Sequence, residues 1–463
     1  MVQKTNSLQL AKTAYDFKLE EVLLSVERIS DKPIDITDLI PELQIYESVD
    51  SRFLSGFMAV SDSIGLLDDI GFVGTEKVNI KISLLPSTKE DVPTTINRNF
   101  IIAGIDAINK GETLDTYSLQ IIEDTGYINY LENVNQPFLG TGEEIIKQVV
   151  DGFFERTVEE LSGDKSNTKP LKFISPNMHP FEIIDWVRSL MIREFGFPFY
   201  VYTTLSSENI KINDLLTMLS KPTVNAKNDF NYSAAGSTSD KLDINQQSYV
   251  INSVNFNENV NTLNKIRMGH VGSSNQHVDL LYNSSSREIL HFDVYEMFKN
   301  IKRFGGIKET QSYISYDNKS EVKSKSLHDY NSRTISGIKI GNTYDGALNT
   351  SDVVPIHQQV NARAMKSWLG ENIITIEVPG KRFMATEDEK PIELGDTISI
   401  NFLSPKATAN PENAEDALRD NKKSGEHIVL AIKHLFTTDK YIATVECAKI
   451  TDIENSGEKL KNE

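Results

Sequence analysis

The sequence predicts a β-rich α+β fold in which two related small antiparallel β-barrels flank a helix-containing middle region. Three observations lead to this prediction. Residues 56–124 and 373–451 carry strand patterns in the same order, each with a polar excursion and a hairpin. The residues between these segments place apolar side chains at helical period. Short strands joined by hairpins favour small curved sheets, because closing a sheet hides its hydrogen-bonding edges.

Each copy of the pattern opens with a strand that follows a glycine and an acidic residue. In the first copy the run GTEKVNIKISL starts at Gly74 and places Val78 and Ile80 on one face of a strand. In the second copy the run LGDTISINFL has Gly395 and Asp396 at its start and the same alternation of apolar residues after them. The two runs are therefore predicted to be equivalent strands.

A hairpin follows in each copy, RNFIIAGIDAINKGETLDTYSLQIIED in the first and GEHIVLAIKHLFTTDKYIATVECAKI in the second. Both hairpins turn through polar residues and return on a tyrosine that opens an alternating strand. His434 lies in the outgoing strand of the second hairpin, where a hydrogen-bonded structural imidazole is favoured over an acid or base. Chance similarity is the alternative, and the shared order of elements favours a repeat. The residues expected to build the barrel framework are Gly74, Val78, Ile80, Tyr117, Gly395, Asp396, His434 and Tyr441.

Amphipathic helices are predicted between the two copies. In TGEEIIKQVVDGFFER, Thr141 and Glu144 have the spacing of a capping box ahead of apolar residues at helical period. HPFEIIDWVRSLMIREFG begins with Pro180, which suits a first helical turn, and ends at Gly196. FPFYVY then reads as a strand, and a third helical run, IHQQVNARAMKSWLG, leads into the second barrel.

The chain of 463 residues is long enough for roughly three domains with separate cores. Long polar loops are expected at 225–247 and 404–424, because both segments are poor in apolar residues. The predicted division is a first β-barrel at 1–125, a helical mixed domain at 126–224, a middle mixed domain at 225–365, a second β-barrel at 366–452 and a polar tail at 453–463.

Composition limits the function classes that the chain can belong to. Hydrophobic residues make up 39% and charged residues 25%, which is ordinary for a soluble globular protein. No apolar run approaches the ~18 residues of a membrane span, and the start lacks the apolar core of a secretory signal, so cytoplasmic synthesis is expected. A single cysteine, Cys447, excludes disulfides and cysteine-based zinc sites within one chain. The formal charge of −18 disfavours tight binding to a phosphate backbone.

The sequence gives little support to a catalytic or metal-binding role. The sequence holds no nucleophile elbow, phosphate loop, zincin helix or dinucleotide fingerprint. A metal site at His270, His277 and Asp279 is one possibility, and surface turn residues are the favoured explanation because nothing fixes these ligands. We therefore expect a protein without metal, cofactor or catalytic residues, and not an enzyme.

Adjacent carboxylates raise the alternative of a cell-wall glycosidase, in which two acidic groups face a sugar. A simpler explanation is that one pair lies in a helical first turn, where the helix dipole favours negative charge, and that the other clusters lie in turns. The clusters are Asp68 with Asp69, Glu143 with Glu144, and Glu387 with Asp388 and Glu389.

Four segments in order carry a family resemblance: FMAVSDSIGLLDDI with VNIKISL; INYLENVNQPFLGTGEEIIKQVV; HPFEIIDWVRSLMIREFGFPFYVY; and ELGDTISINF with EHIVLAIKHLFTTDKYIATVE. In these segments the chain resembles the baseplate central hub proteins of T4-like contractile-tail phages. That family is related in fold to the N-terminal part of secretion-system spike proteins and to phage late-control tail proteins. The chain departs from the family pattern in its loops at 225–247 and 404–424, which are longer.

The resemblance implies a structural homotrimer in which two barrels per chain give a ring of six quasi-equivalent units. Such a ring adapts a hexameric tail tube to a trimeric spike and surrounds the channel through which DNA leaves without specific binding. Its implied partners are further copies of itself, the tail tube protein, the central spike or tail lysozyme protein and other baseplate proteins. Its implied location is the virion tail baseplate, after assembly in the host cytoplasm. The alternatives are a secretion-system spike base, a tail-associated cell-wall hydrolase and a sugar-binding β protein.

Overall fold

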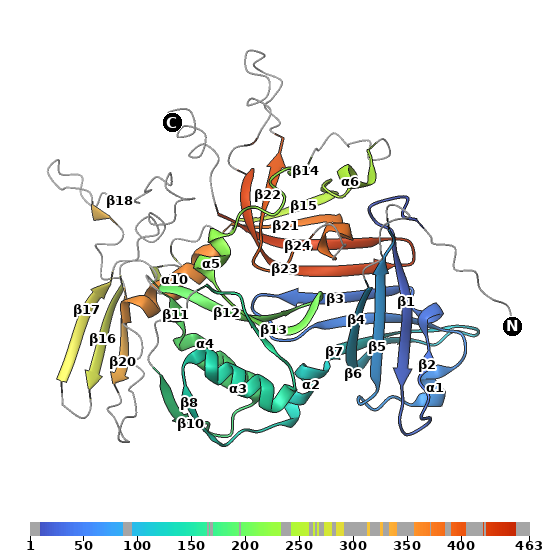
Figure 1. Cartoon of the computed structure of the whole chain (residues 1–463), viewed down its shortest axis with the longest axis horizontal. Coiled ribbons are helices and arrows are strands. Elements are labelled where there is room, and N and C mark those ends of the chain that lie inside the picture. Colours follow the sequence, from blue (N-terminus) through green and yellow to red (C-terminus); the bar gives the residue numbers. More distant parts are fainter. Residues whose placement is uncertain are drawn as a thin grey trace, which may run out of the picture.

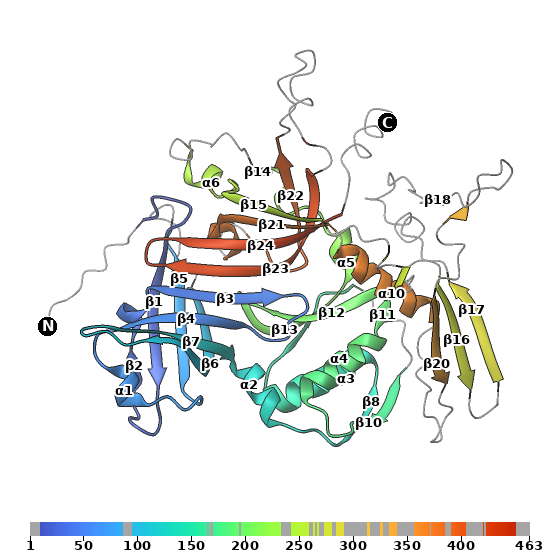
Figure 2. The same ribbon diagram turned by 180° about the vertical axis from the view of Figure 1, so that it is seen from behind.

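The computed structural model places the chain in a β-rich fold, shown from two sides in Figures 1 and 2. It describes residues 10–86, 95–163, 166, 170–193, 196–232, 242–258, 263, 266–267, 273–279, 284–290, 313–314, 325–326, 333–339, 356–370, 372–384, 390–403, 420 and 423–450.

One sheet of 13 strands dominates the molecule. Its strands alternate buried and exposed side chains, as in β5, because apolar residues occupy every second position. The first half of the sheet contains β1 (Phe17–Ser25), β2 (Ile34–Asp35), β3 (Glu42–Ser48), β4 (Ser55–Asp62), β5 (Lys77–Leu84), β6 (Thr95–Asn109) and β7 (Asp115–Glu123). The second half contains β14 (Phe230–Tyr232), β15 (Ser253–Glu258), β21 (Asn372–Pro379), β22 (Thr397–Phe402), β23 (Gly425–Thr437) and β24 (Tyr441–Lys449).

The two halves of the sheet are copies of one topology. The first unit has the order β3-β4-β7-β6-β5, and the second has β15-β21-β24-β23-β22, with all neighbours antiparallel. When the five strands of each unit are numbered along the chain, they lie side by side in the order first, second, fifth, fourth, third in both units. The segments around Ile80 and Ile400, predicted to be equivalent, form the third strand of each unit.

The equivalence extends to individual residue pairs. Val78 of β5 pairs with Phe100 of β6, and Ile398 of β22 pairs with His427 of β23. In both units the ladder between the fourth and fifth strands is interrupted by one extra residue, between Ile102 and Gly104 in β6 and between Val429 and Ala431 in β23. A β-bulge at the same place in both copies gives both long strands the same bend.

Each unit is a strongly curved half-barrel. The fourth strand is long, with 15 residues in β6 and 13 in β23, and it pairs with different neighbours along its length. In Figure 1, β1 and β5 cross the view steeply relative to β3 and β4, which shows the curvature of the first unit. The flanking strands differ, because β1 is antiparallel to β5 whereas β14 is parallel to β22.

The predicted fold class is confirmed: the protein is β-rich α+β, with two related antiparallel units and helices between them. The second unit also recruits β14 and β15, which lie inside the segment 225–365 predicted as a separate middle domain. Among the described residues no ladder joins β1 to β3, so the first sheet is an open half-barrel.

The middle region packs α3 against α4 below the central strands in Figure 1. The capping box predicted at Thr141 and Glu144 is present at the start of α3, and α4 begins at Pro180 as predicted. The elements of this region are α2 (Asp124–Leu131), β8 (Pro137–Gly140), α3 (Gly142–Phe154), β9 (Val158–Glu160), β10 (Leu171–Ile174), α4 (Pro180–Leu190), β11 (Ile192–Arg193), β12 (Phe197–Thr204), β13 (Ser207–Asp214) and α5 (Leu215–Ser220).

The remaining described elements are short or lie at the periphery. The helices are α1 (Leu66–Ile70), α6 (Ile244–Gln247) and α10 (Ile356–Leu369), with 3-10 turns at η1 (Thr37–Leu39) and η6 (Gly380–Phe383). The strands are β16 (Ser273–Asp279), β17 (Ser284–Leu290), β18 (Tyr313–Ile314), β19 (Lys325–Ser326) and β20 (Arg333–Lys339). The described helices include none long and apolar enough to cross a membrane.

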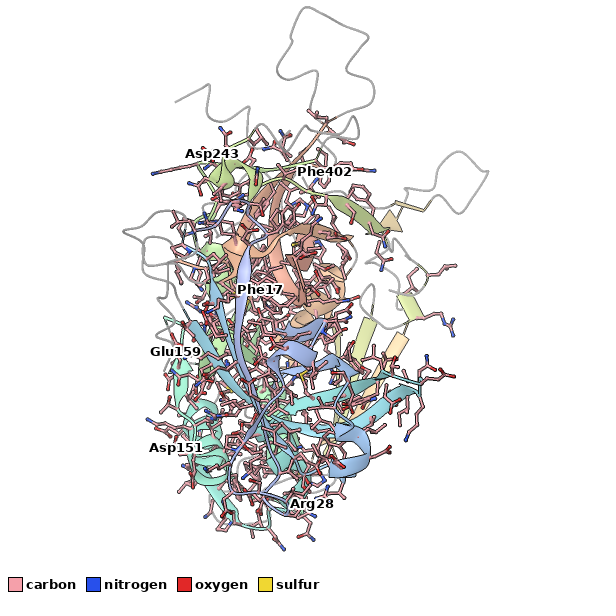
Figure 3. All side chains as sticks on the ribbon, turned by 90° about the vertical axis from the view of Figure 1, so that its right-hand side faces the viewer. Phe17, Arg28, Asp151, Glu159, Asp243 and Phe402 are labelled. Carbon is pink, nitrogen blue, oxygen red and sulfur yellow. The ribbon has the colours of Figure 1, made fainter. Side chains whose placement is uncertain are left out.

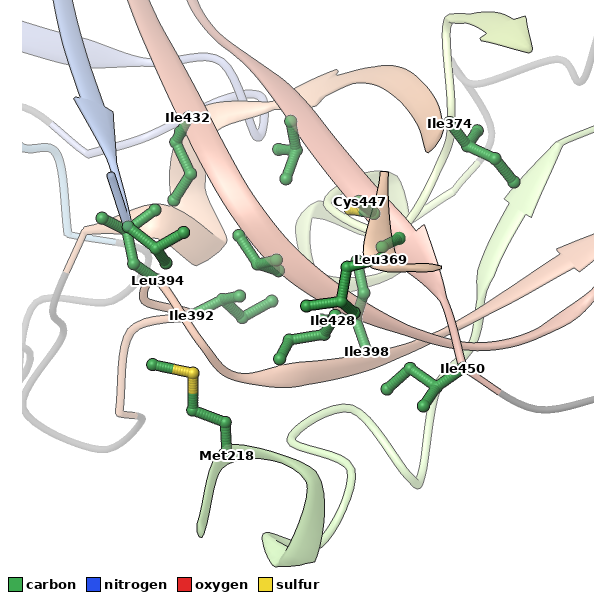
Figure 4. Close-up of a cluster of buried hydrophobic side chains, with 14 of the residues drawn as sticks. Met218, Leu369, Ile374, Ile392, Leu394, Ile398, Ile428, Ile432, Cys447 and Ile450 are labelled. Carbon is green, nitrogen blue, oxygen red and sulfur yellow. The ribbon is translucent and has the colours of Figure 1, made fainter. Parts of the chain in front are cut away.

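Three apolar cores hold these parts together. One lies in the second unit, where Met218 of α5 and Leu369 of α10 meet Ile398 and Ile428 of the sheet (Figure 4). A second fills the first unit, and a third lies between α3, α4 and β12. Figure 3 shows the molecule from the side, with Phe17 between the two units. Phe17 packs against the core of the first unit, which also includes Phe436 and Tyr441 of the second unit.

Several predicted features fall outside the described residues. These are His270, the acidic cluster Glu387, Asp388 and Glu389, most of the polar loop 404–424 and the tail 453–463. His277 and Asp279 lie in β16, for which the backbone alone is described.

Candidate assembly interface between the two units

The two units meet where β23 of the second unit lies against β3 of the first. The first part of β23 pairs with β22, and its last part, from Ala431 to Thr437, pairs with β3 from Ser48 to Glu42. The two half-barrels therefore form one uninterrupted hydrogen-bonded sheet. In Figure 1 β24, β23, β3 and β4 run side by side across the centre of the molecule.

A buried polar group lies at this junction. The Nδ1 atom of His434 is 2.7 Å from the hydroxyl oxygen of Tyr441, and its Nε2 atom is 3.5 Å from a carboxylate oxygen of Glu47. The other oxygen of Glu47 accepts a hydrogen bond of 2.5 Å from the backbone N–H of Leu205 in the middle region. Both rings are fully buried, and burial together with the Glu47 charge raises the pKa of Tyr441 far above its usual value. The group therefore ties both units and the middle region together.

Aromatic rings close the same junction. Phe436 and Tyr441 stack with centroids 4.4 Å apart, and Phe17 of β1 lies 5.2 Å from Phe436. The backbone N–H of Tyr441 donates to the carbonyl oxygen of Tyr15 at 2.8 Å. Gly380 leaves room for the Tyr441 ring, because a Cβ at this position would lie 2.2 Å from ring carbons. The hairpin tip of the second unit is thus covered by the first unit.

The acidic residues at the start of the two third strands, Glu76 and Asp396, are register equivalents, and a glycine lies shortly before each of them. Gly74 has φ of +88° and Gly395 has φ of +78°, a left-handed conformation that favours glycine. The carbonyl oxygen of Glu76 accepts a hydrogen bond of 2.9 Å from the N–H of Ile102. The carbonyl oxygen of Asp396 accepts one of the same length from the N–H of Val429, which is the residue equivalent to Ile102. These turns set the entry of β5 and β22 into their sheets.

The pKa values of the two acidic side chains are shifted in opposite directions. Burial opposes ionisation of Glu76, but hydrogen bonds from the N–H groups of Val73 and Gly74, both 3.0 Å, outweigh it and lower its pKa. Burial raises the pKa of Asp396, which accepts one hydrogen bond of 3.1 Å from Glu393 N. Both groups accept hydrogen bonds from backbone N–H groups of their own turns.

The other predicted framework residues are core residues of the units. Val78 and Ile80 are buried in the core of the first unit. Tyr117 is buried there too, with its hydroxyl 3.5 Å from a carboxylate oxygen of Asp62, and burial raises its pKa. Tyr117 pairs with Val60, while the residue at the same position in the second unit is Ala443, so the tyrosines of the two returning strands are not register equivalents. The structure brings together His434 and Tyr441, and leaves the remaining predicted residues apart from them.

A second tie between the first unit and the middle region was not evident from sequence. Arg98 of β6 is buried, lies 3.6 Å from the carboxylate of Glu123, and donates from Nε to the carbonyl oxygen of Leu205 at 3.1 Å. It also donates to the carbonyl oxygens of Thr204 and Ser207. A charged residue at an inward strand position is the signal that could have pointed to this contact, because such a residue needs partners.

Three of the carboxylates considered for catalysis have partners within the protein, namely Asp68, Glu143 and Glu144. Asp68 is exposed and lies 2.7 Å from Lys110 Nζ. Glu143 accepts from the N–H of Ser166 at 2.6 Å, and Glu144 accepts from the N–H of Thr141 at 2.8 Å as part of the capping box. Within the described part of the chain, no three His, Cys, Asp or Glu side chains converge as metal ligands would. In the part of the chain that the structure describes, these three carboxylates take part in an ion pair, a loop contact and a helix cap.

Comparison with known proteins gives structural neighbours only. No protein-family model matches the chain, and no curated protein matches it in sequence. A tail protein from Neisseria meningitidis aligns with 94% of this chain and 97% of its own, at 10% identity and a TM-score of 0.47. The 43 kDa tail protein of prophage MuSo2 from Shewanella oneidensis aligns with 93% of this chain and 98% of its own, at 9% identity and a TM-score of 0.47.

A third neighbour is an E. coli component of the type VI secretion system, described as structurally similar to the T4 bacteriophage tail proteins gp27 and gp5. It aligns with 94% of this chain and 77% of its own, at 7% identity and a TM-score of 0.40. The chain is thus similar over most of its length to tail proteins and to a secretion-system component, at TM-scores that leave its function to be argued from its own geometry.

Proposed function

We propose that the chain is a structural subunit of a contractile phage tail, and that it acts as the baseplate central hub. The observation that carries the proposal is the duplication: one chain contains two units with the same strand order, the same ladder registers and the same bulge. Three chains with two such units each present six similar faces while keeping threefold symmetry. A subunit of this kind can bind a hexameric tail tube on one side and a trimeric spike on the other.

The junction between the units supports the same proposal. Because β23 pairs directly with β3, each chain supplies two neighbouring units already joined in a continuous sheet. A ring of three such chains has three junctions within chains and three between chains. The buried Glu47, His434 and Tyr441 group makes the junction within each chain rigid, which suits a load-bearing part of a contracting tail.

In the proposed particle the ring surrounds the channel through which the genome leaves. The formal charge of −18 per chain would repel DNA phosphates, so the DNA would pass without specific binding. The proposed partners are other copies of the chain, the tail tube protein, the central spike or tail lysozyme protein and other baseplate proteins. The proposed location is the virion tail, after assembly in the host cytoplasm.

The proposal is tested by the mass of the assembled protein and by its symmetry. Light scattering on the purified chain, alone and mixed with the trimeric spike protein proposed as its partner, is expected to give three copies of the chain. Electron microscopy down the axis should show a ring with six lobes. A chain that stays monomeric or dimeric in both samples would remove the ring. Cell-wall hydrolysis that a single carboxylate substitution abolishes would favour the hydrolase alternative instead.

A further inference from the structure

The junction between β23 and β3 has an unused counterpart elsewhere in the same chain. The last part of β23 is equivalent to the last part of β6, and β3 is equivalent to β15. The segment of β6 from Gly104 to Asn109 pairs with β7 on one edge only, and β15 pairs with β21 on one edge only, among the described residues. Each chain therefore carries both halves of a second junction, one on β15 at an end of the sheet and one on the last part of β6.

The registers on both sides fix how these two edges correspond to the existing junction. On the β15 side, Leu43 pairs with Met58 in the first unit and Val254 pairs with Ile376 in the second. Met58 pairs with Leu119, and Ile376 pairs with Val445. Leu119 and Val445 are equivalent, because each lies two residues before the residue of the fifth strand that pairs at the bulge. Met58 and Ile376 are therefore equivalent too. Leu43 of β3 therefore corresponds to Val254 of β15, and the next inward residues correspond in the same way.

On the β6 side, Ile105 and Ile432 are equivalent, since both follow the shared bulge by the same number of residues. Beyond Asp106 the strand carries a further irregularity, where Ala107 has φ of +54°. This extra residue places Ile108 at the position that His434 occupies in β23. Position by position, β6 thus offers the edge that β23 offers to β3.

The inward side chains at the junction between β23 and β3 are buried, whereas those at the equivalent positions of β6 and β15 are more exposed. His434 is fully buried, whereas Ile108 at the equivalent position is 53% exposed. Ile45 of β3 is fully buried, whereas Phe256 at the equivalent position of β15 is half-buried. Apolar residues thus occupy the central positions of both unpaired edges, which is the pattern expected of surfaces that become covered.

We propose that β15 of a second copy of this chain adds to the free edge of β6, in the register that β3 and β23 use within one chain. Transferred to the two edges, that register sets Asp106 opposite Asn257 of the next copy and Ile108 opposite Phe256, with Ala107 bulged out. Each copy gives one β6 edge and receives at one β15 edge, so the contact is head-to-tail and closes only as a ring. The inference rests on the proposed function, because that function supplies the ring.

A second copy is the occupant that the chain itself specifies. A strand from an unrelated protein could also add to a free edge, because backbone pairing is not specific to sequence. The internal junction shows that this chain already joins the equivalent edges of β23 and β3, with the same bulge in the longer strand. The paired position of Lys433 and Tyr46 in that junction provides an internal reference for the proposed contact.

The test is disulfide formation across the predicted pair in the assembled protein. Asp106→Cys together with Asn257→Cys, both at exposed positions, should give covalent dimers and trimers on mild oxidation. Lys433→Cys with Tyr46→Cys should cross-link within one chain, without a gain in mass, and Cys447 is buried away from both. Asp106→Cys with Asn255→Cys, two residues out of register, should cross-link far less.

The outcomes separate the inference from the proposed function. A three-copy mass with a covalent ladder from the 106 and 257 pair supports the junction. A three-copy mass without that ladder, while the 433 and 46 pair closes normally, overturns the junction and leaves the ring. A chain that never exceeds one copy, alone or with the spike, overturns both. A ladder that favours the pair of 106 with 255 overturns the proposed register.

Discussion

The Nδ1 atom of His434 lies 2.7 Å from the hydroxyl oxygen of Tyr441, across the two strands of the second hairpin and directly over the seam where the two units join. On the far side of the imidazole the carboxylate of Glu47 lies 3.5 Å from Nε2. A polar group without access to water is costly unless it is paired. The three side chains therefore hold β23, β24 and β3 in one arrangement, and the junction becomes a rigid part of the sheet.

Tyr441→Phe is expected to lower the free energy of unfolding by about 1 kcal/mol, because the buried imidazole loses its partner at Nδ1 while the ring stack is kept. Chemical denaturation followed by fluorescence measures the change. Tyr130→Phe is the matched control, since Tyr130 is 64% exposed, and its effect should stay within about 0.5 kcal/mol. Equal effects at the two positions would show that the Tyr441 hydroxyl does not stabilise the junction.

Gly380→Ala should destabilise the protein by about 1–3 kcal/mol, because the added methyl group meets the ring of Tyr441 at 2.2 Å and that ring is fully buried against Phe436. Gly152→Ala in the interior of α3 is the control. A Cβ there meets no atom within 4 Å, and the change should stabilise the helix by about 0.5–1 kcal/mol. Thermal unfolding of both variants measures the opposite signs, and a neutral Gly380→Ala would contradict the packing argument.

His427 gives a prediction about pH. Burial lowers the pKa of His427 to about 3, against an ordinary value of 6.5, with its Nδ1 at 3.0 Å from the carbonyl oxygen of Gly425. The unfolded chain takes up the proton first, so stability is lost as pH falls from about 6.5 toward 3, by at most about 1.4 kcal/mol per pH unit.

The equivalent residue in the first unit is Phe100, which suggests a reciprocal pair of variants. His427→Phe should flatten the dependence of the unfolding free energy on pH between 6.5 and 3. Phe100→His should steepen it, because it buries a second imidazole. Denaturant titrations at several pH values compare the slopes with that of the unchanged protein. An unchanged slope in His427→Phe would mean that another group dominates this range.

The repeat could be predicted from sequence because it is written in local patterns. A glycine and an acidic residue precede both third strands, and apolar residues alternate within them. The capping box of Thr141 and Glu144 is complete within four residues. Such signals depend on near neighbours in the chain. The equivalence of the strands around Ile80 and Ile400 follows from the same local alternation.

The junction could not be predicted in this way, because it depends on residues far apart in the chain. Glu47 is one of many carboxylates, and only the pairing of β3 with β23 brings it to His434. The role of β15 was also missed, since its partner β21 lies beyond a long intervening segment and its own alternation of Val254 and Phe256 is short. Register equivalence of Tyr117 with Ala443, and not with Tyr441, likewise depends on where each strand is paired.

The buried pair of Arg98 and Glu123 has no counterpart in the second unit and gives the last prediction. Burial raises the pKa of Glu123, and the charge of Arg98 counteracts this effect. Arg98→Met should therefore cost about 3–5 kcal/mol at neutral pH, because it leaves a buried carboxylate without its cation and removes the hydrogen bonds that Arg98 donates to three carbonyl oxygens.

The sign of the pH effect follows from the raised pKa of Glu123. In Arg98→Met the folded state binds the proton more tightly than the unfolded state, so stability falls as pH rises above the ordinary value of about 4.5. Arg98→Met with Glu123→Gln keeps an acceptor for the backbone N–H of Leu54, which Glu123 binds at 2.9 Å, and removes the charge. The double variant should be more stable than Arg98→Met at pH 8 and should lose the added pH dependence. Urea denaturation at pH 5 and pH 8 measures both differences, and equal stability of the two variants at pH 8 would show that the lost carbonyl contacts, and not the unpaired carboxylate, carry the cost.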